Sequence, residues 1–121
     1  MRFTYGPVLC SPHVLATVAE KRVAAARGSI AVEMEGAPIA ASAAQAGIPF
    51  VSVRAILDTA DTELPFVGKV IDPQNGAVKP LALATYLATY PGALPAWLAM
   101  QHMRRAAEAS LDKFFGVWFE E

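Results

Sequence analysis

Residues 29–58 read SIAVEMEGAPIAASAAQAGIPFVSVRAILD and decide the fold class of the chain. Residues 29–33 are short and apolar and end in a carboxylate, which is typical of a buried strand. Residues 35–46 consist mostly of small side chains and predict a helix that ends at Gly47. Residues 49–56 are rich in β-branched side chains and predict the clearest strand of the chain. Strand, helix and strand in this order form a βαβ unit with parallel pairing, so we expect an α/β fold.

Two further elements precede this unit. Residues 3–10 predict a strand or the approach to one, and residues 17–27 predict a helix. Thr17 is the expected N-cap of that helix, and Gly28 follows its expected last residue.

The sequence after the unit predicts a loop and two helices. Residues 59–79 are polar and interrupted by Pro and Gly, with one short strand expected at 68–71. Residues 80–89 and 94–119 predict helices, and the apolar positions of the second recur every three or four residues on one face. These positions are Met100, Met103, Ala107, Leu111, Phe114 and Trp118. We expect one domain over residues 1–121, with the last helix packed in the core or against another subunit.

The composition limits the classes of function. With 55% hydrophobic and 17% charged residues, the chain is too apolar to be disordered, and a partner is expected to cover part of its surface. The net charge of -1 leaves no basic surplus, so nucleic acid is not an expected partner. No apolar run reaches the roughly 20 residues of a membrane span, no segment reads as a signal peptide, and the single Cys10 fits a reducing compartment. We expect a cytoplasmic protein without stable membrane insertion.

Acidic residues stand at the ends of two neighbouring predicted strands. Glu33 and Glu35 end the first, and Asp58 follows the second. In open α/β sheets, ligands bind beyond the carboxyl ends of the strands. Three carboxylates in one crevice repel one another unless cations, hydroxyl donors or protonation relieve the charge. The structural alternative is that Glu33 pairs with Arg54 and that Glu35 stabilises a helix N-terminus.

Other kinds of site have no support in the sequence. His13 and His102 lie far apart, and neither has a second ligand at metal spacing, so we expect no metal. No Gly-rich phosphate-binding loop or nucleophile elbow occurs, and we expect no cofactor.

Residues 31–37, which read AVEMEGA, and residues 49–61, which read PFVSVRAILDTAD, resemble the purine nucleoside phosphorylase/nucleosidase superfamily. Both motifs are similar to those of methylthioadenosine/S-adenosylhomocysteine nucleosidases. The flanks at residues 16–22 and 90–96 resemble the hopanoid-associated phosphorylase branch, which acts on adenosylhopane. The resemblance implies a partial nucleoside-phosphorylase-like three-layer fold, of which this chain covers only the C-terminal half.

The resemblance assigns roles to the residues of the first motif. Glu35 would hold the ribose hydroxyls, and Met34 would pack against the sugar. Glu33 would support the site or join the ribose network. Val14 and Leu15 fall where the family lines the base pocket.

Asp58 would face N7 of the purine as the catalytic acid. Such an acid must be protonated near neutral pH, so its pKa must be raised by burial or by neighbouring acids such as Glu33 and Glu35. The nucleosidases often have Ser before this Asp, whereas this chain has Leu57, and the hydroxyl that could orient the acid is absent.

The implied reaction is cleavage of the N-glycosidic bond of a purine nucleoside by phosphorolysis or hydrolysis, with inorganic phosphate as the possible co-substrate. Because the family sheet would be cut through its middle, we expect a homo-oligomer or a complementing N-terminal half. Two alternatives remain open. One is a non-catalytic fragment or pseudo-enzyme that binds nucleosides or completes an oligomer, and the other is a purely structural oligomerisation module.

Overall fold

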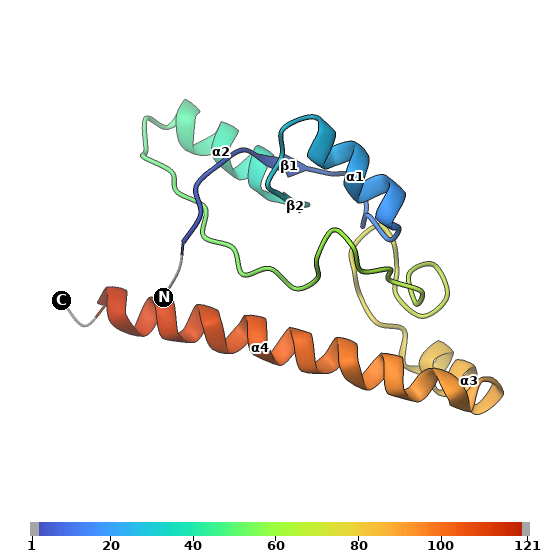
Figure 1. Cartoon of the computed structure of the whole chain (residues 1–121). Coiled ribbons are helices and arrows are strands. Elements are labelled where there is room, and N and C mark those ends of the chain that lie inside the picture. Colours follow the sequence, from blue (N-terminus) through green and yellow to red (C-terminus); the bar gives the residue numbers. More distant parts are fainter. Residues whose placement is uncertain (1–2, 120–121) are drawn as a thin grey trace.

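The computed structural model of the protein describes residues 3–119 and has a mixed α/β architecture. Strands β1 (Val8–Cys10) and β2 (Ala31–Glu33) form a two-stranded parallel sheet, and helix α1 (Val18–Ala26) connects them. The paired residues are Val8 with Ala31, Leu9 with Val32, and Cys10 with Glu33. The expected α/β class, a βαβ unit and the long C-terminal helix are therefore confirmed (Figure 1).

Both ends of α1 follow from local sequence signals. Thr17 is the N-cap, as expected, and its side chain accepts a hydrogen bond from the backbone of Glu20. The Glu20 side chain in turn accepts from the backbone N–H of Thr17, which completes a capping box. After the helix, Gly28 takes a φ of 87°, a conformation that glycine adopts without steric cost.

Helix α2 (Gly36–Gln45) follows β2 after two residues. Glu35 occupies its N-cap position, and Pro38 lies in the first turn, where a missing N–H is tolerated. Gly47 stops the helix with a φ of 67°. The expected helix over residues 35–46 is confirmed to within one residue at each end.

The predicted strand over residues 49–56 is wrong. This segment is irregular and forms no strand. Within residues 3–119, no backbone hydrogen bond connects it to either strand of the sheet. Its β-branched side chains suit a pleated, half-buried surface, but a strand exists only where a neighbour completes the ladder. Val51 is 80% exposed, so no such surface covers it. The βαβ unit therefore lies one step earlier in the chain, as β1, α1 and β2.

The C-terminal part consists of helix α3 (Pro80–Thr89), the short 3-10 turn η1 (Pro91–Ala93) and helix α4 (Leu94–Phe119). Both helices have the bounds that the sequence predicts. In Figure 1, α4 runs along one side of the molecule, α3 lies beside its first turns, and α1, α2 and the sheet lie on the opposite side. None of the helices within residues 3–119 combines the length and the apolarity that crossing a membrane requires.

The apolar core lies between α4 and the segment of residues 64–71. Phe66 packs edge to face against Trp97, with ring centroids 5.2 Å apart, and Val70 is fully buried. The buried members of this cluster are Leu64, Phe66, Val70, Ile71, Trp97 and Met100. The predicted short strand at 68–71 is wrong, because this segment forms turns with isolated bridges whose backbone bonds are local.

Candidate functional site

Glu33, the last residue of β2, has a structural role. Its Oε2 accepts hydrogen bonds from the backbone N–H of Glu35 at 2.8 Å and of Gly36 at 2.6 Å. These are N–H groups that the start of α2 leaves without a helical partner. The same oxygen lies 2.8 Å from Nη2 of Arg54. The structural alternative in which Glu33 pairs with Arg54 is confirmed, and the same carboxylate also caps α2.

The environment of Glu33 keeps it ionised. Burial alone would raise the pKa of this carboxyl, but hydrogen bonds from the Glu35 and Gly36 N–H groups, with smaller contributions from Cys10 and Arg54, hold it below its usual value. Gly36 leaves the space that this arrangement needs. A Cβ at that position would lie 2.8 Å from Oε1 of Glu33, so only glycine allows the carboxylate to sit against the helix start.

Glu35 is the opposite case. It is exposed, and its side chain makes no capping hydrogen bond to α2. Among the residues that the structure describes, no hydrogen bond or ion pair uses its carboxylate. Met34 is half-buried between the two glutamates. Glu35 is thus the carboxylate of this motif that remains available to a ligand.

Asp58 is held by α1. Its carboxylate accepts a hydrogen bond from Nζ of Lys21, and this ion pair is mostly buried, with 10% of the Lys21 side chain and 18% of the Asp58 side chain exposed. The same ammonium donates to the backbone carbonyl groups of Thr59 and Thr62. Two of the three acids are therefore each paired with a cation, Glu33 with Arg54 and Asp58 with Lys21.

Further contacts fasten the Asp58 segment to the start of α1. Glu63 Oε1 accepts from the backbone N–H of Val18 at 3.0 Å, and the N–H of Leu64 donates to the carbonyl oxygen of Ala16 at 2.8 Å. The capping-box residue Glu20 lies at the same helix start, and hydrogen bonds from Thr17 hold its pKa below the usual value. The position of Asp58 thus depends on α1 rather than on a strand ladder.

Val14 and Leu15, the two residues expected at the base pocket, lie in different surroundings. Val14 packs against the core cluster, and its N–H donates to the carbonyl oxygen of Pro73 at 2.8 Å. Leu15 instead lines a hollow of about 440 Å³ between the end of β1 and α1. Of the two, Leu15 is the one that faces an open space.

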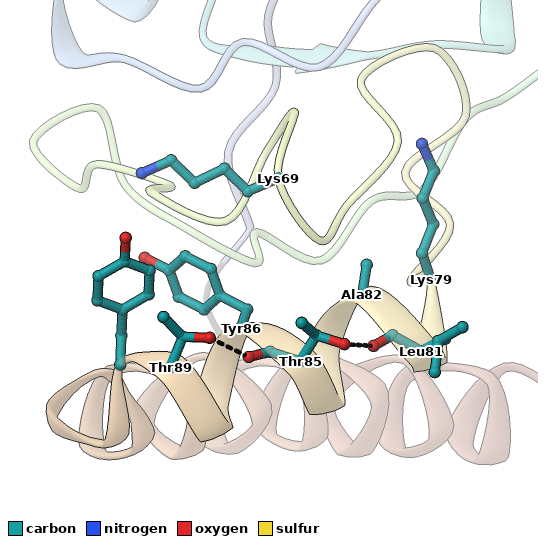
Figure 2. Close-up of a pocket in the computed structure, with 8 residues that line it drawn as sticks. Lys69, Lys79, Leu81, Ala82, Thr85, Tyr86 and Thr89 are labelled. Atoms are coloured by element: carbon teal, nitrogen blue, oxygen red, sulfur yellow. Dashed lines mark hydrogen bonds between the residues drawn. The ribbon is translucent and has the colours of Figure 1, made fainter.

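A second, larger hollow of about 610 Å³ runs along α3, and Figure 2 shows Lys69 above Tyr86 and Lys79 near the start of the helix. The residues that line it are Lys69, Lys79, Leu81, Ala82, Thr85, Tyr86, Thr89 and Tyr90. Neither Glu33, Glu35 nor Asp58 lines it. Although this hollow is the larger of the two, we therefore do not place the proposed reaction there.

Sequence reasoning did not identify Lys21 as a site residue. Lys21 and Asp58 are 37 positions apart, and no local spacing signals their contact. The only signal for this end of α1 is the Thr17 and Glu20 pair at capping-box spacing. Within residues 3–119, no group of three or more His, Cys, Asp or Glu side chains could hold a metal ion.

Comparison with known proteins gives the family of the chain. No curated protein and no solved structure matches it. The sequence profile of the family described as the phosphorylase superfamily matches residues 1–86, which leaves α4 outside the match. The matched segment contains the Glu33 to Glu35 motif and Asp58. Because 86 of the 121 residues match, the chain belongs to the phosphorylase superfamily of nucleoside phosphorylases and nucleosidases.

Proposed function

We propose that residues 30–61 form the ribose- and base-binding half of a purine nucleoside site. The observation that carries this proposal is the division of work between the two glutamates of the motif. The carboxylate of Glu33 accepts hydrogen bonds from the N-terminus of α2 and pairs with Arg54. The carboxylate of Glu35 is exposed and has no hydrogen bond or ion pair within the described residues. A carboxylate of this kind can accept hydrogen bonds from two adjacent ribose hydroxyls.

In the proposed reaction, the N-glycosidic bond breaks and its electron pair goes to the purine. Positive charge develops on the sugar, which the nearby carboxylate of Glu35 stabilises while Met34 packs against the ring. A proton passes from the carboxyl group of Asp58 to N7, which makes the base a better leaving group. An oxygen of water or phosphate then forms the new bond to the sugar carbon. An attacking water loses a proton to the solvent in this step, and Asp58 regains its proton from the solvent before the next cycle.

The substrate that we propose is an adenosine-type nucleoside. The motifs resemble those of methylthioadenosine/S-adenosylhomocysteine nucleosidases, and the flanks resemble the branch that acts on adenosylhopane. An apolar substituent would suit the aromatic end of α4, where Phe115, Trp118 and Phe119 are exposed. We propose that the protein acts in the cytoplasm, needs no cofactor, and uses phosphate only as a co-substrate.

We further propose that the site is completed by another polypeptide, either a second copy or an N-terminal half. The two strands of the sheet have no further neighbours within residues 3–119, and Ile30, Val32 and Val51 are exposed. Exposed strand edges with apolar side chains favour pairing with another chain.

A second candidate is nucleoside binding without turnover. It is favoured by the ion pair between Asp58 and Lys21, because this contact already engages the Asp58 carboxylate. Binding would then depend on Glu35 alone.

The test is release of free adenine from methylthioadenosine or adenosine by the purified chain, with and without phosphate. We expect Asp58→Asn to abolish release and Glu35→Gln to weaken nucleoside binding in calorimetry. Asp61→Asn is the matched control, since Asp61 is exposed and its only ion pair, within the described residues, is the loose one with Arg22. Binding without release would support the second candidate. Absence of both would contradict any nucleoside role and leave the structural one.

A further inference from the structure

The structure assigns to Lys21 the role of a positioning residue that fixes the place of the Asp58 carboxyl group. This inference deepens the proposed function and rests on it, because Asp58 is the proposed proton donor. The supporting observation is a contact between α1 and the irregular segment that contains Asp58. The mostly buried ammonium group of Lys21 makes this contact.

The ammonium of Lys21 has three N–H groups and three acceptors. These acceptors are a carboxylate oxygen of Asp58 and the backbone carbonyl oxygens of Thr59 and Thr62. An exposed ion pair contributes little to stability. This one is mostly buried, and losing the lysine would leave a carboxylate and two carbonyl groups without their donor.

No regular structure holds Asp58 otherwise. Residues 49–64 form neither helix nor strand, so side-chain contacts determine where the carboxylate points. Lys21 itself is well placed because α1 begins at a capping box and because Glu63 binds the N–H of Val18 at the same helix start. The orientation of the Asp58 carboxylate therefore depends on the position of α1.

The contact with Lys21 also bears on the proposed proton step. By holding the Asp58 carboxyl group in one place, the ammonium would spare the reaction the cost of ordering a proton donor that lies on an irregular segment. The other charged groups around this segment are Arg22, Asp61, Glu63 and Glu20, and none of them contacts the Asp58 carboxylate in the described part of the chain.

The experiment compares Lys21→Met with Arg22→Met as the matched control. Arg22 is the next residue of the helix, and its pair with Asp61 is loose and exposed, at 3.4 Å. In hydrogen exchange of the full chain, we expect the amides of residues 58–64 to exchange faster in Lys21→Met only. In adenine release, we expect Lys21→Met to lower the maximal rate by up to about 100-fold, the lower range for a positioned proton donor. The KM should stay nearly unchanged, and Lys21→Arg, which keeps a donor at this position, should restore most of the rate.

Each outcome decides a different point. Unchanged exchange in Lys21→Met would overturn the inference whether or not the chain is active. A lower rate that Lys21→Arg does not restore, or a KM that rises as much as the rate falls, would make Lys21 a merely structural contact and would also overturn the inference. Faster exchange together with no adenine release from the unmodified chain would contradict the proposed function while leaving the contact of Lys21 with Asp58 supported.

Discussion

The cluster between residues 64–71 and α4 differs from the region around the two-stranded sheet in what holds it together. The first contains nearly all of the large buried side chains, with Phe66, Val70 and Trp97 in mutual proximity. In the second, the only buried apolar residue among those described before position 64 is Ala24, and hydrogen bonds and ion pairs make the connections. One region is stabilised by burial and the other by polar contacts.

The apolar cluster that stabilises the chain lies apart from the proposed acids of the site. In the polar region around the sheet, by contrast, the same contacts hold both the local fold and the proposed site. The apolar cluster contains no acid of the proposed site, and its contact with the Asp58 segment is through Leu64, whose N–H donates to Ala16. Around the sheet, Glu33 and Lys21 each fix the local fold and also set the surroundings of a proposed ligand-binding acid. Substitutions in the apolar cluster should therefore lower mainly the free energy of unfolding, whereas substitutions in the polar region should also disturb the proposed site.

The largest effect is expected from Trp97→Ala in the apolar cluster. Removing this indole leaves a cavity against Phe66 and should lower the free energy of unfolding by about 3–5 kcal/mol. Urea unfolding followed by circular dichroism measures it. Leu98→Ala, one residue along α4 and exposed, should change the value by less than about 0.5 kcal/mol. Equal effects of the two variants would show that this cluster is not the stabilising core.

Glu33→Gln should have the next largest effect, this time in the polar region. The change removes the charge that caps α2 and pairs with Arg54, and it should cost about 1–3 kcal/mol in urea unfolding. Glu35→Gln is the matched control and should leave stability unchanged, because no described residue contacts that carboxylate. If the control proved as destabilising as Glu33→Gln, the division of work between the two glutamates would be wrong.

Acid should produce a smaller loss through the same group. The pKa values of Glu33 and Glu20 are lower in the folded chain than the usual 4.5, so the unfolded chain binds more protons at acidic pH. Their stabilisation is complete above the usual value and is lost as the pH falls through the lowered ones. Urea midpoints measured from neutral pH down to about pH 3 should therefore decline, and the decline should be shallower in Glu33→Gln. An equally steep decline in that variant would contradict the sign of the Glu33 shift.

Local signals were sufficient to predict the helices. Caps and stops lie next to the segments that they end, as at Thr17, Gly28 and Gly47. The apolar face predicted for the last helix is confirmed only in part, because Met100 is buried whereas Trp118 is 65% exposed. The strand over residues 49–56 was predicted wrongly for the converse reason. Alternating apolar side chains encode a fit to a pleated surface, but they do not say whether another strand is present to complete the ladder.

The candidate site was predictable only in part. The sequence placed three acids at the ends of neighbouring elements, and the pairing of Glu33 with Arg54 was among the expected alternatives. Which glutamate caps α2 depends on how a side chain folds back over two residues. The ion pair of Lys21 with Asp58 connects residues 37 positions apart, across a segment without regular structure, where neither period nor spacing gives a signal.

The smallest effect is expected at the start of α1, from Thr17→Ala. The hydroxyl of Thr17 accepts from the Glu20 N–H at 3.2 Å, and loss of such a cap costs about 1 kcal/mol. Urea unfolding gives the stability, and hydrogen exchange at the first turn of α1 gives the local effect. Because α1 carries Lys21, a frayed first turn should also loosen the segment of Asp58.

Thr85→Ala is the control for this last change, since it removes a threonine hydroxyl from an exposed helix position without touching a cap. The Thr85 hydroxyl donates to the carbonyl oxygen of Leu81 within α3, a bond that contributes little to helix stability, and alanine has the higher helix propensity. Thr85→Ala should therefore be neutral or slightly stabilising. Faster exchange over residues 58–64 in Thr17→Ala, but not in Thr85→Ala, would show that the cap of α1 helps to order the segment that contains the proposed catalytic acid. Unchanged exchange there would confine the cap to local stability and leave Lys21 as the contact that matters.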